Sequence, residues 1–139
     1  MPNNSRFAMA LHMIVVLARR KDEFVSSSYI AHSVNTNPVV IRRVLALLIA
    51  AKIVATEKGK KGGYRLRKCP SEISLWDVYK ALGEEHLFAT HQNPINVKCP
   101  VSCNMKQALK TVFGRAEKAA QAELKKITLQ CLVGDCVKK

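Results

Sequence analysis

Apolar residues recur at intervals of three and four through the first fifty residues, which is the spacing of one face of a helix. The first run predicts a helix from Ser5, whose hydroxyl would cap it, to about Arg20. The second predicts a short helix over residues 27–34. The third predicts a helix over residues 38–51, with a core face formed by Ile41, Val44, Leu45 and Leu48.

The segment between the second and third predicted helices has the composition of a turn. Asn35, Thr36 and Asn37 end the second helix, and Asn37 then caps the third. Pro38 occupies the first helical position, where its missing N–H costs nothing. Two short helices joined by a turn of a few residues predict a helix-turn-helix motif.

Weak alternation of apolar and polar residues follows, over residues 53–56 and 64–67, and predicts two short strands. Between them, Gly59, Gly62 and Gly63 permit the positive φ angles of a hairpin. A hairpin after a helix-turn-helix is a wing. The predicted fold class is therefore mostly α with a small β-hairpin wing, a winged helix-turn-helix followed by a long C-terminal helix.

The second half of the chain is expected to hold two further helices. Ser74 would cap one that ends before Gly83, and residues 84–101 lack any period, which indicates an extended loop. A helix over about residues 102–129 is expected because apolar positions recur from Met105 to Ile127. So long a stripe on a small chain needs a partner helix, which favours self-association.

Charge and hydropathy narrow the possible partners. The net charge is +13, and residues 52–68 hold seven Lys and Arg against one Glu. A basic patch focused on a hairpin indicates a surface that contacts phosphate. No apolar run reaches the roughly 18 residues of a membrane span, and no secretory signal is apparent. We therefore expect a cytoplasmic protein with nucleic acid, and no membrane, as partner.

The order of motifs resembles that of the Rrf-two family of bacterial transcription regulators. The resemblance covers nearly the whole chain, and its most specific part is the wing followed by an Ile-Ser-Leu helix. The matching motifs are Ser5-Arg-Phe-Ala8, Asn37-Pro38, Val40-Ile-Arg42, Gly62-Gly-Tyr-Arg-Leu66, Ile73-Ser-Leu-Trp-Asp-Val-Tyr79 and Cys99-Pro100. The family implies a homodimer with crossed long helices, one recognition helix per half-site of double-stranded operator DNA, and wings in the minor groove.

These predictions divide the chain into four parts. A winged helix-turn-helix DNA-binding domain would occupy residues 1–83 and a sensor loop residues 84–101. A dimerisation helix would follow over residues 102–130. Residues 131–139 would form a poorly ordered tail.

The candidate DNA contacts come from three segments of the first domain. Lysines of the wing would neutralise phosphates, and an arginine of the third helix would read a base edge. One of the two arginines there would otherwise pair with an acidic neighbour. The full set is Ser26, Ser27, Ser28, Asn37, Val39, Arg42, Arg43, Lys58, Lys60, Lys61, Gly62, Gly63, Tyr64 and Arg65.

Cys99 and Cys103 are the candidate sensing residues. Cys103 falls at the start of the long helix, where the N-terminus favours a thiolate, and Lys98 adds positive charge beside Cys99. Oxidation to a disulfide, within one chain or across a dimer, would shift the long helices. The alternative is that both are inert, partly buried thiols.

The same cysteines bear on cofactors. Cluster-binding members of the family carry three closely spaced cysteines in this loop, whereas two stand here, and a cluster normally takes four ligands. No cofactor is therefore expected. The alternative is an iron–sulfur cluster or a metal held by Cys99 and Cys103 with His86, His91 or a second protomer.

The predicted function is that of a homodimeric transcription regulator, a repressor that responds to redox or electrophile stress. A basic module that binds RNA or a protein without regulating transcription is the alternative from another class. An enzyme is not expected, because no Ser/His/Asp arrangement, nucleotide loop or carboxylate pair stands at usable spacing.

Overall fold

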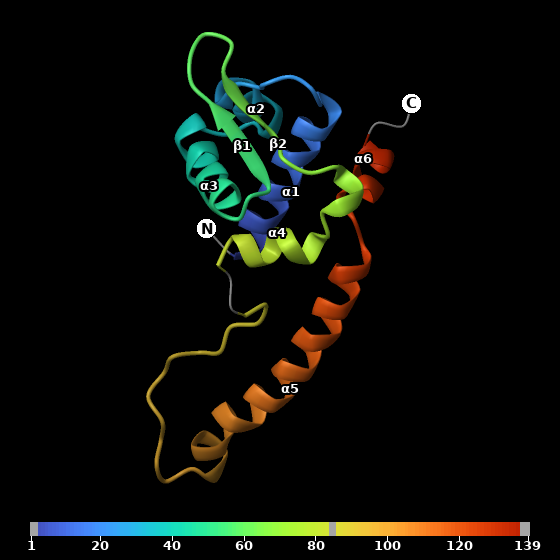
Figure 1. The fold of residues 1–139 in the computed structure, drawn as a ribbon. Coiled ribbons are helices and arrows are strands. Elements are labelled where there is room, and N and C mark those ends of the chain that lie inside the picture. The colour runs from blue at the N-terminus through green and yellow to red at the C-terminus, as the bar shows by residue number, and fades with distance from the viewer. Residues whose placement is uncertain (1–2, 84–85, 137–139) are drawn as a thin grey trace.

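The computed structural model describes residues 3–83 and 86–136, which form a compact head and one projecting helix (Figure 1). This arrangement confirms the predicted fold class, mostly α with one antiparallel hairpin. In chain order the elements are α1 (Asn3–Arg19), α2 (Ser27–Val34), α3 (Pro38–Ala50), β1 (Val54–Glu57), β2 (Gly63–Leu66), η1 (Pro70–Glu72), α4 (Leu75–Ala81), α5 (Pro100–Lys126) and α6 (Leu129–Cys136).

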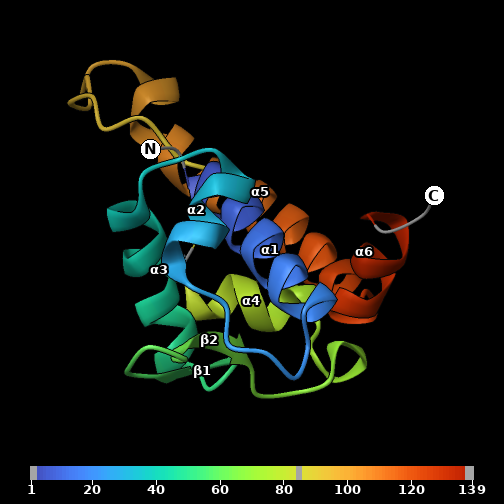
Figure 2. The same cartoon turned by 90° about the horizontal axis from the view of Figure 1, so that it is seen from above.

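Helix α1 is the centre of the head. It lies between α3 and α6 in Figure 2 and also contacts α2, α4 and β2. Its Met13, Ile14 and Leu17 are fully buried, together with Ile41 and Leu45 of α3. The helical stripes found in the sequence are therefore the core faces of these helices.

Local capping explains where three helices begin. The Ser26 side chain accepts a hydrogen bond from the backbone N–H of Tyr29 at 3.1 Å, and Asn37 accepts one from Val39 at 2.7 Å. Ser74 and Asp77 form a reciprocal capping box at α4. Helix α1 differs from expectation: it already begins at Asn3, so Ser5 lies inside it and does not cap it.

Both strands of the wing differ from the predicted bounds by one residue. Strand β1 lies one residue later in the chain than predicted, and β2 lies one residue earlier. The pairs run from Val54 opposite Leu66 to Glu57 opposite Gly63. Gly59 and Gly63 have φ values of +111° and +145°, which confirms the positive φ angles predicted there, whereas Gly62 has no positive φ.

The C-terminal residues differ most from the sequence prediction. Helix α5 ends at Lys126, and Ile127 is extended, with its carbonyl accepting the Leu75 N–H at 2.9 Å. The Leu129 N–H donates to the Ile73 carbonyl at 2.8 Å, and α6 then packs on α1 and η1. The expectation of a helix to residue 129 or 130 and of a poorly ordered tail from residue 131 is wrong for the described residues, which reach Cys136 as helix. Residues 84–85, at the start of the expected sensor loop, and residues 137–139, at the end of the expected tail, lie outside the described residues.

No single helix in residues 3–83 and 86–136 combines the length and hydropathy of a membrane span. Helices α2 and α3 meet both criteria only when they are joined, and they are bent by 110° at the break between them.

Candidate nucleic-acid interface

Helices α2 and α3 meet at 110°, within the range of a helix-turn-helix motif. The start of α3 turns polar residues outward while Ile41 enters the core. Val39 is 44% exposed, and Arg42 and Arg43 are exposed beside it. The arrangement leaves this surface free to enter a groove of DNA.

The two arginines of α3 carry no ion pair among the residues that the structure describes. The alternative that one of them pairs with an acidic neighbour therefore finds no support. Asn37 is different, because its side-chain oxygen already caps α3. Its amide group remains as the donor for a phosphate or a base.

The lysines of the wing lie in the connection between β1 and β2, which forms one end of the molecule in Figure 1. Lys58, Lys60 and Lys61 are all exposed there. A turn holds the connection together, with the Gly62 N–H donating to the Gly59 carbonyl at 3.1 Å. The positive charges are thus presented on a short, ordered loop.

Gly62 and Gly63 have a structural role inside the protein. A Cβ on Gly62 would lie 2.1 Å from the Glu57 carbonyl oxygen, and one on Gly63 would lie 2.5 Å from the Val25 carbonyl oxygen. These glycines let the wing backbone approach its own chain, and their contact with DNA stays a prediction.

Tyr64 and Arg65 join the wing to the start of α2. The Tyr64 and Val25 backbones exchange two hydrogen bonds of 2.8 Å, and the half-buried Tyr64 ring packs against the core. The Arg65 guanidinium lies 4.7 Å from the centre of the Phe24 ring, a cation–π contact. Arg65 is thereby held in place but remains exposed.

A shallow hollow of about 280 Å³ separates the wing tip from the N-terminus of α2. Its lining includes Lys60 and Lys61 of the wing, Ser26, and Arg20 together with its ion-pair partner Glu23. Ser27 and Ser28 begin α2 immediately beside Ser26, so amide groups and hydroxyls lie close to these cations. Such a hollow is suited to a phosphate oxygen of the DNA backbone.

Sequence reasoning missed Arg20 as part of this surface. Its guanidinium lies 4.6 Å from the centre of the Tyr29 ring and forms an ion pair of 3.1 Å with Glu23. Hydrogen bonding to Tyr29, and then to Glu23, raises the pKa of Arg20, so the group stays charged. Only the fold brings Arg20 to the wing, and no local pattern could have indicated it.

The two candidate sensing cysteines lie at the start of α5, at the other end of the molecule from the wing (Figure 1). Cys99 is the N-cap residue and is partly buried, and Cys103 is exposed one turn further. The Cys103 sulfur donates to the carbonyl oxygens of Val97 at 3.5 Å and Asn96 at 3.8 Å. The thiol form of Cys103 therefore holds the loop against the helix.

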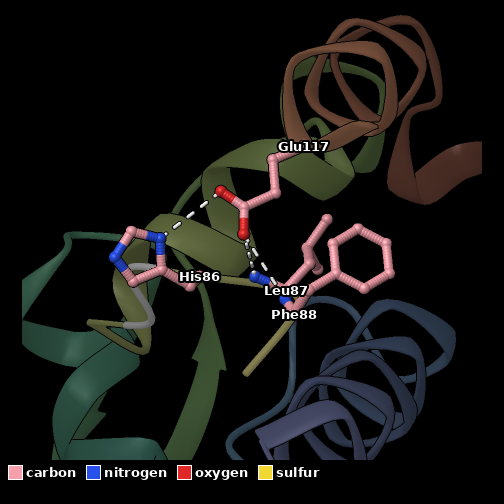
Figure 3. Close-up of polar contacts among 4 residues, drawn as sticks. All are labelled: His86, Leu87, Phe88 and Glu117. Carbon is pink, nitrogen blue, oxygen red and sulfur yellow. Dashed lines mark hydrogen bonds and ion pairs between the residues drawn. The ribbon is translucent and has the colours of Figure 1, made fainter. Parts of the chain in front are cut away.

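The beginning of the loop is fixed by Glu117 of α5 (Figure 3). One carboxylate oxygen accepts the backbone N–H of Leu87 at 3.0 Å and that of Phe88 at 3.4 Å. The other lies 3.4 Å from Nδ1 of His86. The loop is thus attached to the long helix at both of its ends.

The alternative metal site would need His86 or His91 beside the two thiols. Nδ1 of His86 pairs with Glu117, and Nδ1 of His91 accepts the Asn93 N–H. Within residues 3–83 and 86–136 no three His, Cys, Asp or Glu side chains are placed to hold a metal ion.

Comparison of the sequence with known proteins finds a matching family and similar relatives. Residues 3–135 match the Rrf2 (Rrf-two) family, described as "Iron-dependent Transcriptional regulator". The chain is 45% identical over 122 residues to the "Putative HTH-type transcriptional regulator YwnA" of Bacillus subtilis (strain 168), an alignment that covers 87% of this chain and 89% of the relative.

Solved structures of other proteins are also similar to this chain. A crystal structure of a "putative DNA binding protein" is similar with 37% identity and a TM-score of 0.69, covering 90% of this chain and 96% of the other. The oxidized form of Staphylococcus aureus CymR has a TM-score of 0.68 and 96% coverage of both chains. Its identity of 23% makes that likeness one of fold alone.

Proposed function

Because the chain belongs to the Rrf2 family of transcription regulators, we propose that it is a cytoplasmic homodimeric repressor that binds operator DNA and releases it when its loop cysteines are oxidised. The family members found are regulators and not enzymes. The same comparisons make DNA the expected partner. The dimer, the sign of regulation and the signal are the parts that we add.

The observation that carries the DNA-binding proposal is the common exposure of three basic surfaces around one end of the head. The arginines of α3 are free to reach base edges, and the lysines of the wing are free to reach phosphates. Arg20 and the N-terminus of α2, the first helix of the helix-turn-helix, line one hollow together with the wing lysines. This division between base-reading and phosphate-binding residues is typical of sequence-specific DNA-binding proteins.

The proposed dimer is supported by the exposed apolar stripe of α5. No residue of this 27-residue helix is buried within the chain. Val101 is 62% exposed and Val112 is 57% exposed on this helix. A second copy of α5 would cover these side chains, as in a coiled coil.

The proposed redox response starts at the first turn of α5. Oxidation of Cys103 removes the S–H that donates to the Asn96 and Val97 carbonyls, so the loop loses one of its attachments. Since α5 would be the dimer helix, a change at its start would alter the relative position of the two DNA-binding heads. No step of this proposal requires a bound metal.

The DNA-binding proposal is tested by footprinting the reduced protein on the DNA upstream of its own gene. We expect two protected half-sites about 10 base pairs apart, or a multiple of that spacing. Sedimentation should give twice the 15.5 kDa mass of the chain. Equal affinity for unrelated DNA and RNA, without a footprint, would instead show a general nucleic-acid-binding module.

The redox proposal is tested by measuring operator binding of the Cys99→Ser variant with and without the thiol oxidant diamide. Diamide takes two electrons and two protons from a pair of thiols and leaves a disulfide, and it should weaken operator binding of the unmodified protein at least tenfold. Cys99→Ser should bind DNA normally and ignore diamide. Cys136→Ser, exposed on α6, is the matched control and should respond like the unmodified protein. A full response in Cys99→Ser would move sensing to other residues, and iron in the anaerobically purified protein would favour a cluster shared between protomers.

A further inference from the structure

Residues 90–95 run back along the first half of α5 and enclose a hollow of about 320 Å³. We call this segment the strap. The hollow lies away from the DNA-binding surface, near the cysteine end of α5. Its lining consists of the six strap residues with Ser102, Met105, Lys106 and Leu109.

The strap is fastened to α5 on both sides of the hollow. Before it, Glu117 accepts the N–H groups of Leu87 and Phe88 (Figure 3). The Phe88 ring also lies 5.3 Å from the Phe113 ring. After it, the Asn96 N–H donates to Ser102 Oγ at 2.8 Å. These attachments make the hollow a built feature of the chain.

His91, Ser102 and Lys106 bring hydrogen-bond donors to the lining of the hollow, beside the polar side chains of Thr90, Gln92 and Asn93. The Asn93 N–H donates to Nδ1 of His91 at 3.3 Å, so a neutral ring carries its proton on Nε2, where it is a donor. Ser102 Oγ already accepts the Asn96 N–H, which leaves its own hydrogen to donate. Lys106 adds a positive charge, and no Asp or Glu is among the lining residues.

Part of the lining is apolar. Pro94 and Ile95 contribute from the strap, and Met105 and Leu109 contribute from one face of α5. A volume of about 320 Å³ lies at the low end of the range for small-molecule sites. The lining therefore combines donors and one cation with an apolar wall, which is what a small amphipathic anion requires.

We propose that the hollow binds a small organic acid, with its carboxylate at Lys106 and Ser102 and its apolar part against Met105 and Leu109. An inorganic phosphate would satisfy the donors but leave the apolar wall without a partner. The bound acid would join the strap to α5 and order both. Its effect on DNA affinity rests on the proposed function, because it requires α5 to be the dimer helix of a DNA-binding protein. The site itself depends only on the lining described.

The experiment uses the full-length chain without DNA and titrates benzoate by calorimetry. Benzamide, which has the same shape without the charge, and inorganic phosphate, which has charge without an apolar part, are titrated alongside. We expect benzoate to bind, and both comparison ligands to bind at least tenfold more weakly. Absence of benzoate binding overturns the proposal, and so does equal binding of either comparison ligand.

Two variants locate the site. Lys106→Gln should weaken benzoate binding at least tenfold, whereas Lys118→Gln removes the same charge from the same helix outside the hollow and should bind benzoate unchanged. Equal losses in both variants would show general attraction to a basic helix and overturn the site. Charge-dependent benzoate binding by a protein that fails to bind its promoter DNA would overturn the proposed function and leave the site standing.

Discussion

Replacement of Lys58, Lys60 and Lys61 together by glutamine is expected to weaken DNA binding by about 500-fold per half-site at about 0.1 M salt. Each lysine that neutralises a phosphate releases a counterion, and about 0.9 of a decade in affinity is lost per contact at that salt concentration. All three side chains are exposed on the connection between β1 and β2, where they are free to make such contacts. Binding measured by fluorescence anisotropy at several salt concentrations should also show a slope reduced by about 2.7 for each half-site.

The loss should be equal for operator and random DNA, because phosphate contacts carry no sequence information. Replacement of Lys80, Lys110 and Lys118 by glutamine removes the same charge from exposed positions outside the wing and is the matched control. A similar loss of affinity in both triple variants would mean that net charge, and not the wing, drives binding. A loss confined to the operator would mean that these lysines contact bases.

The fold was predictable where the signals are local. Asn37 caps α3 and Pro38 follows it at the first helical position, and both act within one turn of chain. Ser74 and Asp77 act in the same way at α4. The buried stripes of α1 and α3 could be found for a related reason, since the period of a helix is recorded in consecutive residues.

The candidate site was predictable only in part. Exposed lysines in a glycine-rich turn and arginines at the start of a helix are visible in the sequence, and the structure leaves all of them exposed. Arg20 was missed because the fold alone carries it to the wing tip. The close approach of Gly63 to Val25 could not be predicted, because it joins segments that are distant in sequence. In each case tertiary contact decided the role of the residue.

The end of α5 was also predicted wrongly, because a tertiary contact determines where this helix ends. The apolar stripe runs on through Ile127, and nothing in the local composition stops a helix there. The break comes from backbone pairing of Thr128 with Ser74, which lies more than fifty residues earlier in the chain. Once the chain is extended at this point, Leu129 turns into the head and α6 begins.

Leu129→Ala is expected to lower the free energy of unfolding by about 3 kcal/mol, a typical cost of deleting a fully buried leucine side chain. Leu129 is wholly inaccessible to solvent, and its backbone N–H is bonded to Ile73. Because α6 packs on α1 and η1, the cavity would open beside the central helix of the head. Urea denaturation followed by circular dichroism measures the change, at one fixed protein concentration so that any dimer contributes equally.

Cys131→Ala is the control from the same helix, because Cys131 is exposed and its change should stay within about 0.5 kcal/mol. If the two variants were equally stable, α6 would not be packed in solution and the chain after Lys126 would be the loose tail that its composition suggests. A large loss confined to Leu129→Ala would instead show that the C-terminal helix is part of the DNA-binding head. The long helix α5 would then be tied to the head at its C-terminal end through α6, while the cysteines and the strap lie at its far end. A change at the cysteines would in that case reach the DNA-binding surface along a helix that is fixed at the head.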